Sequence, residues 1–283
     1  MKKIIIYLIA FCALGCLACS EDKELGEIES LLPDYTLPQG KSSADDRVVK
    51  LHEQYGTYML YEYTRLDFQY GLSSTYVNTL PDPQYTGDML DLLEYIWFSF
   101  YPKEFNEKYT PYKIFLSDSL WLQSSSGKLT EKYAYASESS LALGFCSDVL
   151  REMSASMKQT YKNELNKQLW TTWMYYYIGF PDEFYKVSDY SIRSSSDKTS
   201  SNYARVMGFV ANNGSEWSAS SLSYGNKSTD LYTYLAGMVS RTTEEWTSDL
   251  EYPLVKKKYD IVRNYIQEKF GFDIQKIGDT VYE

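Results

Sequence analysis

The stretch Tyr161–Trp173, YKNELNKQLWTTW, decides the fold, because it lies in the longest helical pattern of the chain. Apolar residues recur every four positions through this pattern, as expected for the buried face of an α-helix. These residues are Val149, Met153, Met157, Tyr161, Leu165, Leu169 and Trp173. The spacing predicts one long helix, roughly over residues 147–177, with Asn163, Glu164 and Lys167 outside its buried stripe.

The segment Asn163–Lys167, NELNK, has the frame of a zinc-hydrolase helix without its histidines. In an H-E-x-x-H helix the two His side chains reach one metal ion, and the Glu beside the first His acts as general base. Here Asn163 and Lys167 stand at the His positions and Glu164 at the Glu position. Taken alone, Glu164 and Lys167 are an ordinary i,i+3 ion pair on a solvated helix face, and the pentapeptide by itself favours that interpretation.

The first residues have the pattern of a bacterial lipoprotein signal. Two lysines precede an apolar stretch at residues 4–14, which is too short to span a bilayer as a helix. Small residues then lead to two cysteines, and we expect cleavage before one of them and attachment of a diacylglycerol to its thiol. Cys19 is the preferred site, because Ala18 precedes it and the acidic segment 20–24 follows. Cys16 is the alternative, and an ordinary signal peptide with incidental cysteines stays open.

Composition and charge bound the organisation of the chain. We predict a signal peptide at 1–18, a lipid anchor and flexible tether at 19–44, and one folded domain at 45–283. The formal net charge of −10 argues against a nucleic-acid or anionic-membrane partner. The 29 Tyr and 6 Trp residues leave glycan contact open, beside the commoner role of aromatic rings in core packing.

The hydrophobic periodicity predicts an α+β chain that is mostly helical after residue 145. Further helices are expected over 45–54, 87–101 and 254–270 and from about residue 229, and strands over 57–63, 110–116 and within 133–143. Polar, Ser-rich loops are expected over 188–203 and 212–228.

Metal-ligating and nucleophilic side chains are scarce. His52 is the only histidine of the chain, so no H-E-x-x-H helix can be drawn anywhere, and we interpret His52 as structural. Cys146 is the one cysteine that certainly belongs to the folded domain, which excludes an internal disulfide and a Cys₄ zinc site there. We expect Cys146 to be buried in the core.

Several segments, in one order, resemble the substrate import-associated zinc metallohydrolase lipoproteins of Bacteroidetes, a family of zinc-binding metallopeptidases. They are the lipobox, the strand 111–116, the Glu164 helix, 180–188, 208–210, the helix with Asp230 and Leu231, and the tail 258–274. The resemblance implies a zincin-like single domain on the outer face of the outer membrane. It also implies a SusC/SusD-like TonB-dependent importer as partner, and the acidic start after Cys19 resembles a surface-export signal.

In that family the helix carries H-E-x-x-H and a later Glu supplies the third metal ligand. Carried over to this chain, the ligand positions are Asn163, Lys167 and Thr233, while Asp230 matches an Asp of the family pattern. An amide, an ammonium and a hydroxyl do not replace two imidazoles and a carboxylate as zinc ligands. We therefore expect no cofactor, and Glu164 would have no activated water to deprotonate. The former cleft near Glu164, Lys167 and Asp230 is the expected ligand site.

The leading hypothesis is a catalytically inactive lipoprotein that helps an importer to capture a peptide, protein or glycan. One alternative is an active enzyme. It would be either a zinc-dependent peptidase with non-standard ligands, such as His52, Cys146 and Asp230 brought together, or a catalyst that uses Glu164 with another acid. A second alternative is a purely structural subunit of the importer.

Overall fold

The main sheet is built around two continuously buried strands. β3 (Lys113–Leu116) and β7 (Ser140–Leu143) are buried at every position, as expected when both faces of a sheet are covered. β1 (Tyr58–Leu60) pairs parallel to β3, and β3 pairs parallel to β7. The edge strand β6 (Ala134–Ala136) runs antiparallel to β7, which gives the order β1-β3-β7-β6.

The computed structural model describes residues 35–211 and 227–283. The predicted signal peptide, with Cys16 and Cys19, lies outside the described residues, and so does most of the predicted loop 212–228. No helix within the two described ranges is both long enough and apolar enough to cross a bilayer.

The folded unit begins earlier than the sequence suggested. Thr36–Glu283 form one compact unit, so residues 36–44 belong to it and not to the tether. The N–H group of Tyr61 donates to the side-chain oxygen of Gln39 at 2.9 Å, and the N–H group of Lys41 donates to the Tyr61 hydroxyl at 3.0 Å. These bonds hold the segment against the end of β1.

A second, antiparallel sheet and four helices complete the first half of the unit. The sheet has the order β2-β4-β5, with β2 (Tyr76–Thr79), β4 (Ser119–Gln123) and β5 (Leu129–Glu131). The helices are α2 (Asp45–Tyr55), α3 (Arg65–Gly71), α4 (Thr86–Ile96) and α5 (Lys103–Tyr109), with 3₁₀ turns at Pro83–Tyr85 and Phe98–Phe100. The predicted helix near 45–54 is confirmed, and the helix predicted over 87–101 exists but ends earlier, at Ile96. The helices α3 and α5 and the second sheet were not predicted.

The central helix starts later than predicted. α6 spans Ala155–Gln168, because the Ser154 side chain caps it by accepting a hydrogen bond from the N–H group of Met157 at 3.2 Å. The preceding Asp148–Glu152 forms a separate 3₁₀ turn, and Met153 between them is extended. The prediction of one uninterrupted helix from residue 147 is therefore wrong at its start.

The central helix also changes its winding before it ends. Leu169–Trp173 form a π-helical turn, in which the N–H group of Met174 bonds to the carbonyl oxygen of Leu169. The α-helical winding resumes in α7 (Met174–Tyr177). Such π turns occur mostly as single turns within α-helices and often mark functional sites.

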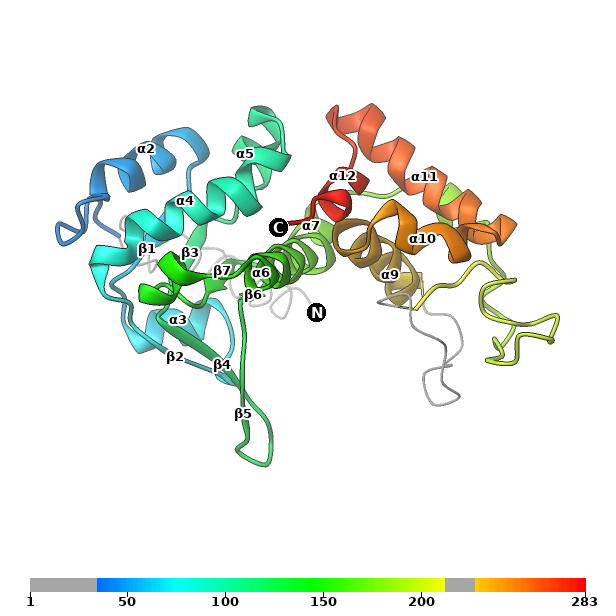
Figure 1. The fold of residues 1–283 in the computed structure, drawn as a ribbon, viewed down its shortest axis with the longest axis horizontal. Coiled ribbons are helices and arrows are strands. Elements are labelled where there is room, and N and C mark those ends of the chain that lie inside the picture. Colours follow the sequence, from blue (N-terminus) through cyan, green and yellow to red (C-terminus); the bar gives the residue numbers. More distant parts are fainter. Residues whose placement is uncertain (1–34, 212–226) are drawn as a thin grey trace, which may run out of the picture. The chain divides into compact units, whose positions relative to one another are not determined.

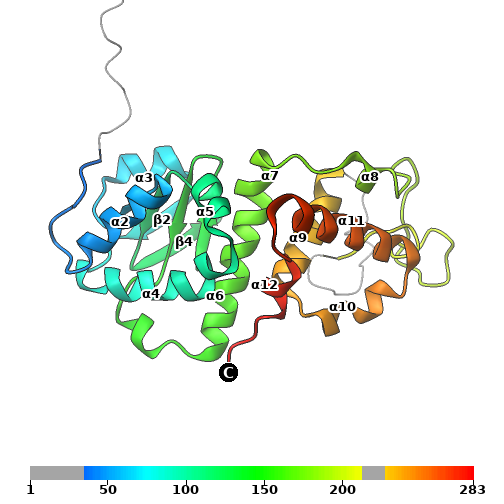
Figure 2. The same cartoon turned by 90° about the horizontal axis from the view of Figure 1, so that it is seen from above.

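α6 lies between the two halves of the unit. It packs on β6 and α4 on one side and on α9 (Lys227–Ser240) on the other, as Figures 1 and 2 show. Tyr161, Leu165 and Leu169 of the predicted stripe are fully buried. One core cluster of apolar side chains runs through both halves, and it includes this stripe.

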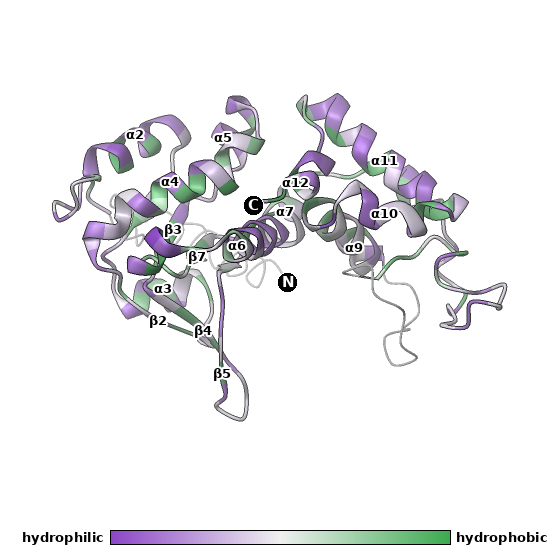
Figure 3. Ribbon diagram, in the orientation of Figure 1, coloured by the Kyte–Doolittle hydropathy of each residue, from purple (hydrophilic) through white to green (hydrophobic). Residues whose placement is uncertain are grey.

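The second half is helical, as predicted. It contains α8 (Asp182–Tyr185), α9, α10 (Thr243–Leu250), α11 (Pro253–Phe270) and α12 (Gln275–Asp279). α11 begins with Pro253 and ends at Phe270, and it is capped by Gly271, whose φ of 77° favours a residue without a side chain. Figure 3 shows hydrophobic and hydrophilic residues on different faces of this helix. The loop predicted at 188–203 is irregular except for a bridge between Ser195 and Tyr203.

Candidate functional site

The Glu164 side chain is paired within its own helix. Its Oε1 lies 3.2 Å from Nζ of Lys167, and both side chains are partly exposed to solvent. The Asn163 side-chain oxygen accepts a hydrogen bond of 3.2 Å from the Gln159 amide. All three residues of the degenerate motif thus lie on α6 with partners of their own, in the solvated arrangement that the pentapeptide alone favoured.

The other two predicted site residues, Thr233 and Asp230, lie on α9 and are buried. The Thr233 hydroxyl donates to the backbone carbonyl of Asp230 at 2.7 Å. The Asp230 carboxylate accepts from Nζ of Lys258 at 2.5 Å and from the Tyr190 hydroxyl at 2.6 Å. Because its side chain is 1% exposed, Asp230 is a member of a buried ion pair and not, as predicted, a group that lines an open cleft.

Aromatic rings surround the ammonium of Lys258. Nζ lies 4.6 Å from the ring centre of Phe209, 5.0 Å from that of Phe184 and 5.4 Å from that of Tyr190. Burial lowers the pKa of Lys258 and raises the pKa of Asp230, because both charged forms are removed from water. The mutual attraction of the pair opposes both shifts. Through Tyr190 and Phe209, these contacts attach the loop before residue 211 to Asp230 of α9 and to Lys258 of α11.

His52 and Cys146 do not join Asp230. The His52 ring lies against Tyr58 at 4.3 Å between ring centres, and its Nδ1 lies 3.2 Å from the carbonyl oxygen of Thr57. Cys146 is buried as a free thiol, and burial raises its pKa to about 12. Among residues 35–211 and 227–283, no three His, Cys, Asp or Glu side chains are close enough to hold a metal ion.

The residues at the inferred ligand positions do not fit zinc. Lys167 would place an ammonium against a cation, and it already binds Glu164. The hydroxyl hydrogen of Thr233 points to a backbone carbonyl, and the Asn163 amide is a neutral group. Zinc sites in proteins are built from thiolate, imidazole and carboxylate ligands, none of which these positions supply.

The edge strand β6 is hydrogen-bonded to α6. The N–H group of Ala136 donates to the Gln168 side-chain oxygen at 3.1 Å. Gln168 follows Glu164 by four residues, so the two side chains leave the same face of α6. An outward-facing amide of β6 is therefore not free to pair with an added strand.

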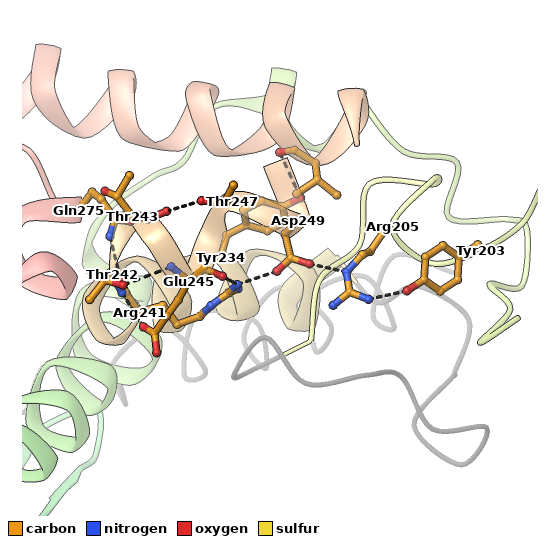
Figure 4. A network of polar contacts seen from close by, with 11 residues as sticks. Tyr203, Arg205, Tyr234, Arg241, Thr242, Thr243, Glu245, Thr247, Asp249 and Gln275 are labelled. Carbon is orange, nitrogen blue, oxygen red and sulfur yellow. Dashed lines mark hydrogen bonds and ion pairs between the residues drawn. The ribbon is translucent and has the colours of Figure 1, made fainter. Parts of the chain in front are cut away.

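A second polar network holds the C-terminal helices together (Figure 4). The Asp249 carboxylate of α10 accepts from Arg205 through Nε and from Arg241 through Nη2, the latter at 2.8 Å. Arg205 also bonds to the Tyr203 hydroxyl, and the Thr242 side chain caps α10. The segment around residues 203–209 is thereby tied to α10, and this is a structural role.

The sheet with its antiparallel edge strand and the long helix packed on it form a zincin-like α+β fold, as the sequence predicted. A crystal structure from Bacteroides caccae, described as a "putative zinc-binding metallo-peptidase", has the same fold with a TM-score of 0.51. It covers 86% of this chain and 92% of its own, at 12% sequence identity, and at that identity the similarity shows the fold alone. No family model and no curated protein sequence matches the chain.

Proposed function

We propose that this protein is a surface lipoprotein with a metallopeptidase-like domain that binds and does not catalyse. Its role would be that of an auxiliary component of a SusC/SusD-like, TonB-dependent importer in the outer membrane. A peptide, protein or glycan would be its ligand.

The observation that carries the proposal is the Glu164–Lys167 ion pair on α6. Metal-dependent hydrolysis needs a bound ion that lowers the pKa of a water molecule, and a base that removes its proton. In this chain an ammonium stands where the resemblance places a ligand, and it neutralises the carboxylate that would serve as base. The fold shared with the Bacteroides caccae protein, which is described as a "putative zinc-binding metallo-peptidase", supports the metallopeptidase-like part of the proposal.

The lipid anchor and the importer rest on the sequence pattern. The basic start, the short apolar stretch and Cys19, with Cys16 as alternative, support membrane attachment through a lipid. The acidic residues after Cys19 support transfer to the cell surface. The importer partner is inferred from the family resemblance.

The first experiment measures zinc retention. The full-length chain, purified in mild detergent, is loaded with zinc, dialysed and analysed for metal content by mass spectrometry. We expect no tightly held zinc in the wild type. A matched variant with Asn163→His, Lys167→His and Thr233→Glu is expected to retain about one zinc ion per chain, because it rebuilds two imidazoles and a carboxylate on α6 and α9.

Two outcomes would contradict the proposal. One stoichiometric zinc in the wild type would contradict the ligand argument. Peptide hydrolysis by the wild type that appears only when zinc is supplied would contradict the binding role. The importer partnership is tested separately, by affinity purification of the tagged chain from its native membrane. Absence of a TonB-dependent channel from the purified material would refute that part.

A further inference from the structure

A shallow surface hollow of about 360 Å³ lies where the β6–β7 turn meets the end of α3 and the end of the central helix. Its lining combines aromatic rings with hydroxyl and carboxylate groups. It includes Tyr70, Tyr135 and Tyr176, together with Ser137, Glu138 and Thr172. Binding pockets typically combine apolar surface with a few polar groups placed to orient the ligand, and this hollow has both.

Two of the tyrosines have most of their surface in solvent. The Tyr70 residue is 83% exposed and Tyr176 is 55% exposed, although large aromatic side chains usually bury most of their surface. The third, Tyr135, is stacked on Tyr76 with 3.8 Å between ring centres, which holds it in place. Exposed aromatic rings that cluster around one hollow indicate a surface that binds a ligand or a partner.

The carboxylate of the hollow stands on a braced turn. The Ser137 and Ser139 hydroxyls both donate to the carbonyl oxygen of Gly71, at 2.6 and 3.0 Å. The Tyr177 hydroxyl donates to the backbone carbonyl of Glu138 at 2.9 Å. The β6–β7 turn is therefore tied to α3 and to α7, and Glu138 projects from a fixed backbone.

The π turn sets which residues of the central helix reach the hollow. A π turn contains about one residue more than an α turn. The residues that follow it therefore face the direction that, in an uninterrupted α-helix, residues about one position earlier would face. Thr172 lies within this turn and Tyr176 follows it, and both line the hollow. Glu138 raises the pKa of the Tyr176 phenol by accepting its hydrogen bond, so ring and carboxylate are neighbours.

We propose that this hollow binds a neutral hexopyranose unit of a glycan. The flat C–H face of a pyranose ring can lie on Tyr70 or Tyr176, and its hydroxyl groups can donate to Glu138 and bond to Thr172. The Glu138 carboxylate and the net charge of −10 repel acidic glycans. An extended peptide is disfavoured, because Gln168 already occupies the outward amide of Ala136.

This inference rests on the proposed binding function and names the ligand class. The test is affinity electrophoresis of the full-length chain in mild detergent, through native gels that contain one polymer each. The polymers are α-mannan and mixed-linkage β-glucan as neutral glycans, polygalacturonate as an acidic glycan, and unfolded casein as a protein. We expect retardation by at least one neutral glycan and by neither of the other two.

Variants locate the site. Tyr70→Ala and Tyr176→Ala are each expected to weaken binding about tenfold, which corresponds to about 1.4 kcal/mol. Tyr176→Phe keeps the ring and is expected to stay within about twofold of the wild type. Tyr112→Ala removes an exposed tyrosine elsewhere (49% exposed) and is the matched control.

Several results would overturn the inference. They are no retardation by either neutral glycan, retardation by casein or polygalacturonate alone, or unchanged binding in both alanine variants. An equal loss in Tyr176→Phe and Tyr176→Ala would also overturn it, because the ring would then not be the contact. None of these results changes the expected zinc content, so failure here is distinct from failure of the proposed function.

Discussion

Substitution of Lys258 by Met should destabilise the protein far more than an ordinary lysine substitution. The Lys258 and Asp230 side chains are 0% and 1% exposed, so Met leaves a buried carboxylate without its cation. Removal of one partner from a buried ion pair costs about 3–5 kcal/mol. For a domain of this size that corresponds to a fall in melting temperature of about 6–20 °C.

The assay is urea unfolding followed by tryptophan fluorescence, with Lys256→Met as the matched control. Lys256 lies on the same helix and pairs with Asp260 at the same 2.5 Å, but these side chains are 58% and 46% exposed. An exposed pair of this kind contributes about 0.2–1 kcal/mol. If the two variants lose equal stability, the argument from burial is refuted.

The pH dependence provides a second check on the same variant. Without Lys258, the pKa of Asp230 in the folded state rises further above its unfolded value, because only burial and the Tyr190 hydroxyl remain to set it. A carboxyl group with a raised folded pKa binds more protons in the folded state, so its stability contribution grows as pH falls toward the unfolded pKa. The loss in Lys258→Met should therefore be largest near pH 8 and smaller at pH 5. A loss that grows toward pH 5 would contradict this sign.

Three further predictions concern other parts of the unit. A Cβ atom at Gly278 would collide with two backbone carbonyl oxygens near the end of α9, so Gly278→Ala should lower the free energy of unfolding by about 3 kcal/mol in urea titrations. Cys146 is buried and its pKa is raised to about 12, so iodoacetamide at pH 8 should modify it in urea and not in the native protein, as mass spectrometry would show. Glu164→Ala and Lys167→Ala should each change stability by less than about 1 kcal/mol in the same titrations, because their ion pair is partly exposed.

The buried stripe of the central helix could be predicted from the sequence, because helical period alone decides it. Tyr161, Leu165 and Leu169 are buried as expected. Their strict four-residue repeat drifts by about 40° per step on a helix of 3.6 residues per turn. The π turn at Leu169–Trp173 takes up part of that drift, so the repeat contained a signal for it. The late start of the helix depends on the capping hydrogen bond of the Ser154 side chain, and the spacing of apolar residues carries no information about capping.

The partners of the candidate site could not be predicted, because they come from distant parts of the chain. Asp230 receives its hydrogen bonds from Lys258 and Tyr190, which lie 28 and 40 residues away. One signal was present: Lys258 falls between Val255 and Val262 on the inward face of α11, where a cation requires a buried acceptor. The resemblance identified Asp230 as notable and placed it in a cleft, whereas packing places it in the core.

Residues near the C-terminus supply the hydrogen-bond acceptors of a buried cation in the central helix. Lys162, in the middle of α6, is fully buried and its Nζ donates to the carbonyl oxygens of Ile277 and Thr280, both at 2.6 Å. These two partners lie 115 and 118 residues further along the chain than Lys162. Without these two carbonyl groups, the Lys162 ammonium could be buried in the central helix only at a cost in folding free energy. We therefore expect a truncation before Ile277 to destabilise α6 and, with it, the sheet half that packs on this helix.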